Sequence, residues 1–175
     1  MFSNPRANVA DLGLIPGMVV ADFGAGVGNY ALEMARTVGA GGKVYAIEVQ
    51  KDLLERLARE AKSQHLLNLE VIWGNVEKPG GTKLKDQAVS VVVMANVLFQ
   101  TDAKYSMALE AKRILRTGGR VVLIDWSGSF GGIGPRADQV VSKDEAKRIF
   151  AEAGLQLQAE FSAGEHHYGL IFIKS

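Results

Sequence analysis

Short apolar runs alternate along the chain with segments whose apolar residues follow helical spacing. Most of these runs are rich in Val and Ile and are apolar at nearly every position. Such runs are typical of parallel strands whose two faces are both covered by helices. The predicted strands are residues 18–21, 44–47, 69–73, 89–95, 121–124, 155–161 and 168–173.

Four segments between these runs show the spacing of amphipathic helices. Their apolar stripes lie at 31–38, 53–61, 107–115 and 146–153. We expect glycine-containing turns to end three of them, at Gly39, at 117–119 and at Gly154. Ser142 and Glu145 have capping-box spacing and are expected to begin the last helix.

The order of the elements predicts the topology of the sheet. Strands that are joined by a helix run parallel, because a parallel crossover needs a dozen or more residues. The last two strands are too close in sequence for such a crossover and are expected to form an antiparallel hairpin. Polar and apolar residues alternate over 155–158, which is typical of an edge strand. We therefore expect a doubly wound α/β sheet that binds ligands at the carboxyl ends of its strands.

Composition narrows the functional classes. A length of 175 residues suits one domain, 1–175, and an apolar content of 47% suits a globular chain. The net charge of +1 gives no overall field to attract nucleic acid or an anionic membrane. The chain has no cysteine, which excludes disulfides and thiolate metal sites, and we predict no metal site. No apolar run reaches the length of a membrane span and no signal layout is present, so we expect a cytoplasmic protein.

A glycine-rich loop after the first predicted strand is the main chemical motif. It reads Asp22-Phe23-Gly24-Ala25-Gly26-Val27-Gly28-Asn29 and precedes a helix, whose free N–H groups favour polar or anionic ligand groups. A dinucleotide fingerprint would need glycine in place of Asn29, so a nicotinamide reductase is the least favoured enzyme.

Two further positions lie at the ends of the next strands. Glu48 follows the second strand and could accept hydrogen bonds from both hydroxyls of a ribose. Asn75 follows the third strand and could pair with an adenine edge, or could simply form a turn. Trp73 is expected in the core rather than on a cofactor.

Together these motifs resemble the class I S-adenosylmethionine-dependent methyltransferases. The resemblance covers about residues 14–173 and is carried by VVADFGAGVGNYALEMA, KVYAIEVQKDLLERL, WGNVE, VSVVVMANVLFQ and AKRILRTGGRVVLIDW, with the closing hairpin. Within the class, the chain is most similar to the small type 11 enzymes, akin to the ubiquinone/menaquinone-biosynthesis methyltransferases. The resemblance implies a Rossmann-like, doubly wound, seven-stranded sheet that is mostly parallel with an antiparallel last strand.

The resemblance also implies S-adenosyl-L-methionine as the cofactor and an in-line methyl transfer to a small-molecule acceptor. The residues that it implies for the methionine part are Asp22, Gly24, Ala25, Gly26, Gly28, Ala95 and Asn96. Those for the ribose and adenine are Glu48, Val49, Asn75 and Val76. Ala95-Asn96-Val97-Leu98 replaces the Asn-Pro-Pro-Tyr type of run of amino-methylating relatives, which disfavours their acceptors.

Methyl transfer from a sulfonium needs alignment more than acid–base chemistry. The candidate catalytic residues are His166 and His167 in the last hairpin and Asp125 at the end of the fifth strand. The alternative for the two histidines is a plain polar hairpin.

Two segments are expected to complete the acceptor side. Residues 127–141 form the longest irregular stretch and are interpreted as a substrate loop, with Phe130 and Arg136 as contacts. Residues 1–13 are interpreted as a partial lid.

Three readings of the function stay open. The first is transfer of a methyl group to a small molecule, and the second is methylation of RNA or protein. The third is a module that binds S-adenosylmethionine without chemistry. A homo-oligomer is compatible with the sequence, because a second subunit could wall the acceptor site.

Overall fold

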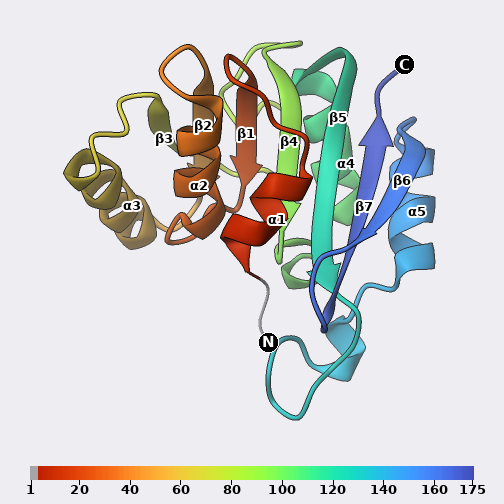
Figure 1. Cartoon of the computed structure of the whole chain (residues 1–175). Coiled ribbons are helices and arrows are strands. Elements are labelled where there is room, and N and C mark those ends of the chain that lie inside the picture. Colours follow the sequence, from red (N-terminus) through yellow and green to blue (C-terminus); the bar gives the residue numbers. More distant parts are fainter. Residues whose placement is uncertain (1–3) are drawn as a thin grey trace.

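A seven-stranded sheet forms the centre of the computed structural model, which describes residues 4–175 (Figure 1). The spatial order of the strands is β3-β2-β1-β4-β5-β7-β6. Their bounds are β1 Val19–Phe23, β2 Lys43–Glu48, β3 Leu69–Trp73, β4 Val89–Ala95, β5 Leu115–Trp126, β6 Gln156–Ser162 and β7 His167–Ile173. Strands β1 to β5 pair in parallel, whereas β7 is antiparallel to both β5 and β6. This confirms the mostly parallel doubly wound sheet with an antiparallel last strand.

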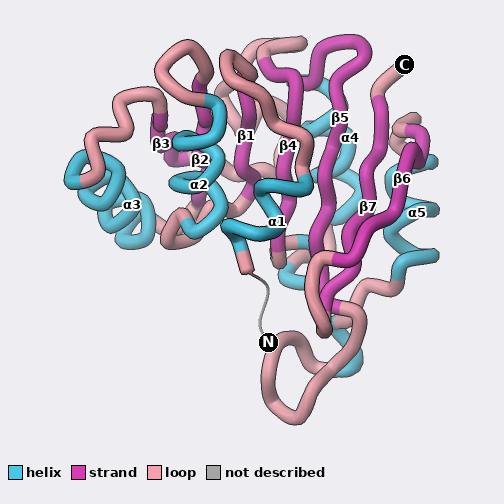
Figure 2. Tube along the Cα trace, in the orientation of Figure 1, coloured by secondary structure: helices cyan, strands magenta, loops and turns pink. Residues whose placement is uncertain are grey.

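Helices cover both faces of the sheet (Figure 2). Helices α1 Pro5–Asp11, α2 Asn29–Val38 and α3 Lys51–Ser63 pack on one face, and α4 Lys104–Ile114 and α5 Lys143–Glu152 on the other. Two short 3-10 helices, η1 Leu98–Gln100 and η2 Ala137–Gln139, follow β4 and precede α5. Successive strand residues point to opposite faces, so each face has its own apolar cluster. We call these the α1–α3 face and the α4–α5 face.

The turn predicted at 117–119 is the clearest correction to the expected elements. Helix α4 ends at Ile114, and β5 begins at once with Leu115. The glycines lie in an irregularity of β5, where the register with β4 shifts. The cause is the C-terminus: backbone bonds join Gly118 and Gly119 to Lys174, whose side chain also donates to two carbonyl oxygens at the end of α4.

Trp73 is also placed differently from the expectation. Its side chain is 52% exposed on the edge strand β3 and is not part of the core. The indole Nε1 donates to the carbonyl oxygen of Val49 at 3.0 Å, and the Nζ atoms of Lys51 and Lys83 lie over the ring. The predicted edge position of residues 155–158, by contrast, is confirmed, because β6 is the last strand of the sheet.

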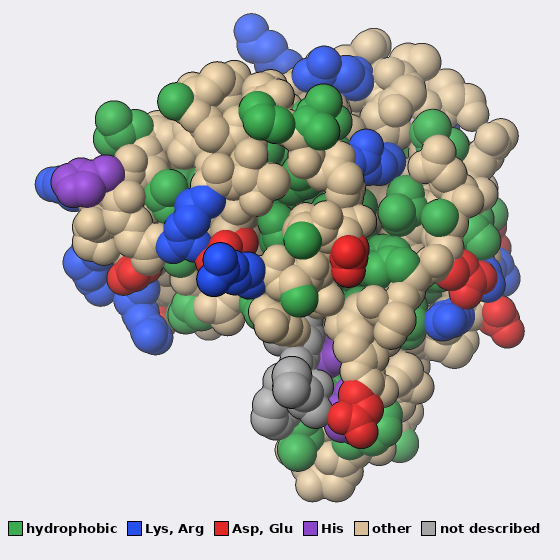
Figure 3. All heavy atoms as spheres, viewed as in Figure 1, with side chains coloured by type: hydrophobic (Ala, Val, Ile, Leu, Met, Phe, Trp, Pro, Cys, Tyr) green, Lys and Arg blue, Asp and Glu red, His purple; other side chains and the backbone are tan. Residues whose placement is uncertain are grey.

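Within residues 4–175 there is no helix long and apolar enough to cross a membrane. The same residues contain no group of three or more His, Asp or Glu side chains suited to a metal ion. Figure 3 shows side chains of both charge signs on the face that carries α1 and α2.

Candidate functional site

Two of the cavities at the carboxyl edge of the sheet are lined by the glycine-rich loop. Cavity A has a volume of about 320 Å³ and cavity B of about 280 Å³. Cavity A is lined by Gly24, Gly26, Ile47, Glu48, Val49, Gln50, Leu53, Gly74, Asn75, Val76, Glu77, Val97, Gln100, Thr101 and Met107. Cavity B is lined by Pro5, Asp22, Gly24, Ala25, Gly26, Val27, Asn29, Tyr30, Ala95, Asn96 and Gln100. Gly24, Gly26 and Gln100 line both, so the two cavities meet over the loop.

The glycines of the loop have different structural roles. Gly26 has φ +56° and borders open space, so its backbone is free to approach a ligand. Gly28 has φ +88°, and a Cβ there would lie 2.1 Å from Cδ1 of Leu57. Gly28 therefore packs the start of α2 against α3 and lines neither cavity, although the resemblance placed it among the methionine residues.

Glu48 fastens the loop to the end of β2. Its carboxylate accepts backbone N–H groups from Gly26 at 2.9 Å, Val49 at 2.8 Å and Gln50 at 2.9 Å. The residue is only 6% exposed, yet it lines cavity A. A carboxylate has about four acceptor positions. The present geometry therefore leaves room for about one ligand hydroxyl, where the sequence suggested two.

Asp22 places an unpaired carboxylate oxygen at the wall of cavity B. The residue is 2% exposed, and Oδ2 has no hydrogen-bond partner. Burial, followed by the negative charge of Glu48, raises the pKa of Asp22 to about 8. A bound cation would reverse this shift, because it stabilises the charged form. The arrangement is suited to a ligand that brings a positive group into cavity B.

The other implied cofactor residues lie at the same edge. Val49 and Val76 line cavity A, and Ala25 and Ala95 line cavity B. Asn75 lines cavity A, while its Oδ1 accepts the backbone N–H of Glu77 at 2.9 Å. This contact is the turn-forming alternative that the sequence left open.

Asn96 has an unusual environment. Its φ is +57°, its backbone N–H donates to Ile124 at 2.8 Å, and its side-chain Oδ1 is buried without a partner. Gln100 closes over it, since Nε2 donates to the Asn96 carbonyl oxygen at 2.6 Å. An unpaired amide oxygen in cavity B is available to a ligand donor.

Sequence reasoning missed several lining residues. Tyr30 stands in the first turn of α2, where its closeness to the glycine motif was a usable signal. Pro5 comes from α1 and Met107 from α4. Nothing in the local sequence marks these two, because only the packing of the helices on the sheet brings them to the cavities.

The three catalytic candidates divide between the two faces of the sheet. Asp125 pairs in register with Tyr168, and Trp126 pairs with His167. Tyr168 belongs to the apolar cluster of the α4–α5 face, so Asp125 and His167 point to opposite faces. Neither of the two histidines nor Asp125 lines cavity A or B. Their catalytic roles stay predictions.

Asp125 organises the segment after β4. Its Oδ1 accepts the backbone N–H of Trp126 at 2.8 Å, and backbone N–H groups of η1 also lower its pKa. Burial outweighs these bonds and raises the pKa of Asp125 to about 6. Tyr168 donates its hydroxyl to the Val141 carbonyl oxygen at 2.9 Å.

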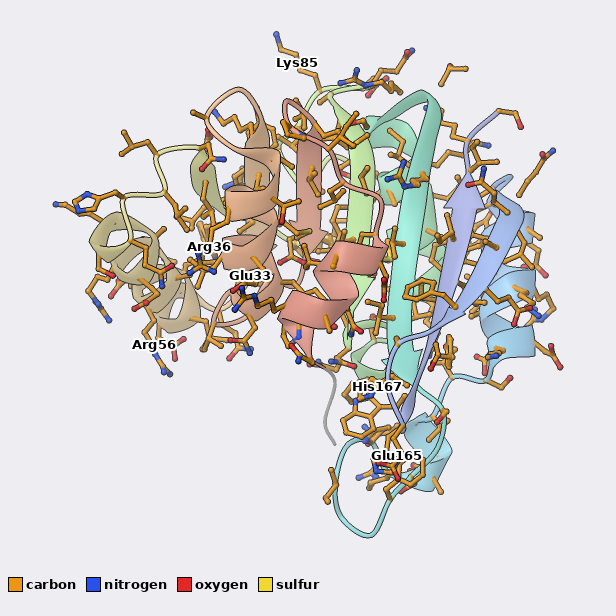
Figure 4. All side chains as sticks on the ribbon, in the orientation of Figure 1. Glu33, Arg36, Arg56, Lys85, Glu165 and His167 are labelled. Atoms are coloured by element: carbon orange, nitrogen blue, oxygen red, sulfur yellow. The ribbon has the colours of Figure 1, made fainter. Side chains whose placement is uncertain are left out.

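The segment expected to be a substrate loop meets the last hairpin through aromatic rings. The ring centroids of Phe130 and His166 are 4.1 Å apart, and those of Trp126 and His167 are 4.3 Å apart. Figure 4 shows His167 at the lower end of β7, beside this loop. Arg136 forms an exposed ion pair with Asp138. The substrate-binding role of residues 127–141 stays a prediction.

The N-terminal segment forms the helix α1. It packs on α2 through Val9 and Leu12, which belong to the apolar cluster of the α1–α3 face. It also brings Pro5 to cavity B. Residues 1–3 of the proposed lid lie outside the described residues.

Comparisons with known proteins all point to the same family. The model of a methyltransferase domain matches residues 14–159. A demethylmenaquinone methyltransferase of Lactococcus lactis is 27% identical over 116 residues, which are 66% of this chain and 45% of that protein. An arsenite methyltransferase of Halobacterium salinarum is 28% identical over 122 residues, 70% of this chain and 30% of that protein. The chain thus spans less than half the length of these two relatives.

Solved structures agree with this family. The crystal structure of a SAM-dependent methyltransferase from Aquifex aeolicus has a TM-score of 0.89 and 27% sequence identity. The match covers 98% of this chain and 90% of that one. The likeness therefore extends over nearly the whole fold, including the strand edge that carries the two cavities.

Proposed function

The chain belongs to the family of S-adenosylmethionine-dependent methyltransferase domains, and we propose that it transfers a methyl group from S-adenosylmethionine to a small-molecule acceptor. The observation that carries the proposal is the pair of cavities that meet over Gly24 and Gly26. One cavity combines apolar walls with a carboxylate, as an adenosine requires. The other holds a buried unpaired carboxylate, as an ammonium group requires.

The residues of the two cavities fit the parts of this cofactor. Glu48 would accept a ribose hydroxyl in cavity A, while Ile47 and Val76 supply apolar surface for the adenine. Asp22 would hold the ammonium of the methionine part in cavity B. When it is bound, S-adenosylmethionine supplies an electrophilic methyl group on a positively charged sulfur.

The remaining task of the protein is to position the acceptor and to exclude water. The strand-end backbone and the glycine loop are rigidly held, because Glu48 ties Gly26 to the end of β2. Such fixed geometry is worth several kcal/mol in a displacement reaction, on the order of 7–11 kcal/mol at most.

The relatives support a small-molecule acceptor. Their names include a quinone methyltransferase and an arsenite methyltransferase. Arsenic(III) is a soft centre that prefers thiolates, and the chain contains no cysteine. The quinone relative is therefore the better guide to the acceptor.

Thermal unfolding tests the cofactor directly. S-adenosylmethionine and S-adenosylhomocysteine should each raise the melting temperature, while NADH and NADPH should not. A ligand at a hundredfold excess over its dissociation constant adds about 2.7 kcal/mol of stability. A shift with a nicotinamide alone would overturn the cofactor assignment.

Turnover must then be measured separately with a panel of acceptors. Binding of the sulfonium pair without turnover on small molecules, RNA or protein would favour a non-catalytic module. Turnover on a macromolecule alone would contradict the small-molecule acceptor.

A further inference from the structure

His167 is a buried histidine whose polar atoms are unused. The residue is 6% exposed, and neither Nδ1 nor Nε2 has a hydrogen-bond partner. A neutral imidazole carries one donor and one acceptor, and leaving both unpaired away from water costs free energy. Such an exception in a well-packed protein calls for an explanation, and a ligand that pairs with the ring is a direct one.

The ring projects from the face of the sheet that carries cavity B. Val20 and Ile124 belong to the apolar cluster of the α1–α3 face. Asp22 and Trp126 each stand two residues further along the same strands, so their side chains point to that face as well. His167 pairs in register with Trp126 and shares its direction. Strands β4, β5 and β7 are neighbours, and His167 pairs two residues beyond the partner of Ala95, so its backbone lies roughly 12 Å from the end of β4.

Hydrogen bonds connect the hairpin of His167 to the wall of cavity B. The Nδ2 atom of Asn8 donates to the hydroxyl of Tyr30 at 2.8 Å and to the carbonyl oxygen of Ala163 at 3.2 Å. Tyr30 lines cavity B, and Ala163 begins the turn between β6 and β7. Helix α1 therefore fixes the hairpin relative to the methionine side of the site.

Aromatic rings surround the imidazole. Trp126 contacts His167, and the centroid of Phe130 lies 6.4 Å from that of Trp126. His166 extends the cluster on the other side of Phe130. Trp126 is buried between His167 and Gly134, whereas Phe130 is only half-buried and offers flat apolar surface on which a planar ligand can stack. Burial, followed by the charge of His166, lowers the pKa of His167 and so favours the neutral form of its ring.

We propose that His167 is the acceptor-binding residue of this methyltransferase. Its unpaired ring nitrogen accepts a hydrogen bond from a hydroxyl of a planar acceptor that lies against Phe130 and extends toward cavity B. We assign no such role to His166 or Asp125. The ring of His166 packs against the ring of Phe130, and Asp125 lies on the opposite face of the sheet. This inference rests on the proposed function, because it assumes that a methyl group is delivered at cavity B.

Imidazole NMR tests the assignment in the unmodified protein. Phenol is the probe, and anisole is the matched probe that lacks the hydroxyl proton. In protein saturated with S-adenosylhomocysteine, phenol should shift the ring nitrogen signals of His167 and leave those of His65 unchanged. Anisole should cause a much smaller shift at His167. If phenol leaves the His167 nitrogens unchanged, the proposal is wrong.

A pair of variants gives the second measurement. His167→Gln should weaken phenol binding about tenfold, the usual cost of one lost hydrogen bond, and leave anisole binding unchanged. His65→Gln, the matched control at an exposed histidine far from this hairpin, should affect neither probe. Equal losses for phenol and anisole in His167→Gln would mean that the ring only packs, and would overturn the proposal.

Failure of the cofactor assignment, on which the proposed function rests, gives a different result. In that case S-adenosylhomocysteine does not bind to the wild-type protein at all. The phenol titration is then carried out on the free protein, where the same His167 shift is required.

Discussion

The proposed cofactor end and the proposed acceptor end of the sheet edge are formed by different kinds of groups. Around β1 and β2, the site consists largely of backbone: the glycine loop, its N–H groups and one carboxylate that ties them together. Around β5 and β7, it consists of large side chains from three segments, namely Trp126, Phe130 and the hairpin histidines. A glycine loop tolerates few substitutions, because its backbone conformation depends on glycine. Large side chains at a strand end can be exchanged for others without loss of the fold. The contrast suggests that one end fixes the cofactor and that the other sets the acceptor.

The largest expected effect comes from substituting the glycine that packs the loop. Gly28→Ala should destabilise the protein by about 3 kcal/mol, because it adds left-handed strain to a clash with Leu57. Gly26→Ala is the matched control. It has a positive φ but open space around the missing Cβ, so about 1–2 kcal/mol is expected. Urea unfolding measures both, and equal losses would show that packing against α3 is unimportant.

The next effect concerns the carboxylate that joins the loop to β2. Glu48→Ala should weaken binding of S-adenosylhomocysteine by about 2 kcal/mol, because it removes a charged hydrogen-bond acceptor and loosens Gly26. Calorimetric titration checks this, with Glu48→Gln as the variant that keeps one acceptor. Unchanged affinity in Glu48→Ala would remove this residue from the ribose site.

A third comparison uses two buried aspartates, Asp22 at the end of β1 and Asp125 near the end of β5. The pKa of Asp22 is raised from 3.8 to about 8, and that of Asp125 from 3.8 to about 6. Between these values the folded chain holds a proton that the unfolded chain releases, so stability falls as the pH rises. The fall should continue to about pH 8 for Asp22 and only to about pH 6 for Asp125.

The affinity for the cofactor should depend on the ionisation of Asp22 and not on that of Asp125. The ammonium of the cofactor favours the charged carboxylate, so affinity should rise as the pH approaches 8. Asp22→Asn should weaken binding about tenfold at that pH and remove the dependence. Asp125→Asn should keep the dependence of the wild type, and binding measured at several pH values will separate the two. Loss of the pH dependence in Asp125→Asn would show that the ends are coupled.

The smallest expected effect is at the acceptor end. His166→Ala and His167→Ala should leave the affinity for S-adenosylhomocysteine within about twofold of the wild type, because neither side chain lines cavity A or B. Titration of both variants beside Glu48→Ala gives the comparison. A loss as large as that of Glu48→Ala would place the hairpin inside the cofactor site.

Much of the fold followed from hydrophobic periodicity. The predicted strands at 69–73 and 89–95 have the observed bounds, and Ser142 caps α5 by accepting the N–H of Glu145. The prediction of a turn at 117–119 was wrong, because Gly118 and Gly119 lie within β5 and form backbone hydrogen bonds with Lys174. The prediction that Trp73 lies in the core was also wrong. An edge strand leaves alternate side chains in solvent, and periodicity alone does not say which strand is at the edge.

The amino-acid sequence by itself determined the family, the doubly wound sheet and the position of the glycine-rich loop, because these depend on local patterns of glycine, carboxylate and apolar spacing. Tertiary structure decided that Gly28 packs against Leu57 and lines neither cavity, and that the Glu48 carboxylate accepts three backbone N–H groups. It also decided that Asp125 and His167 point to opposite faces. The physical reason is that strand alternation and helix packing join residues that are distant in sequence. The direction of a side chain at a strand end is therefore settled only when its neighbours are in place.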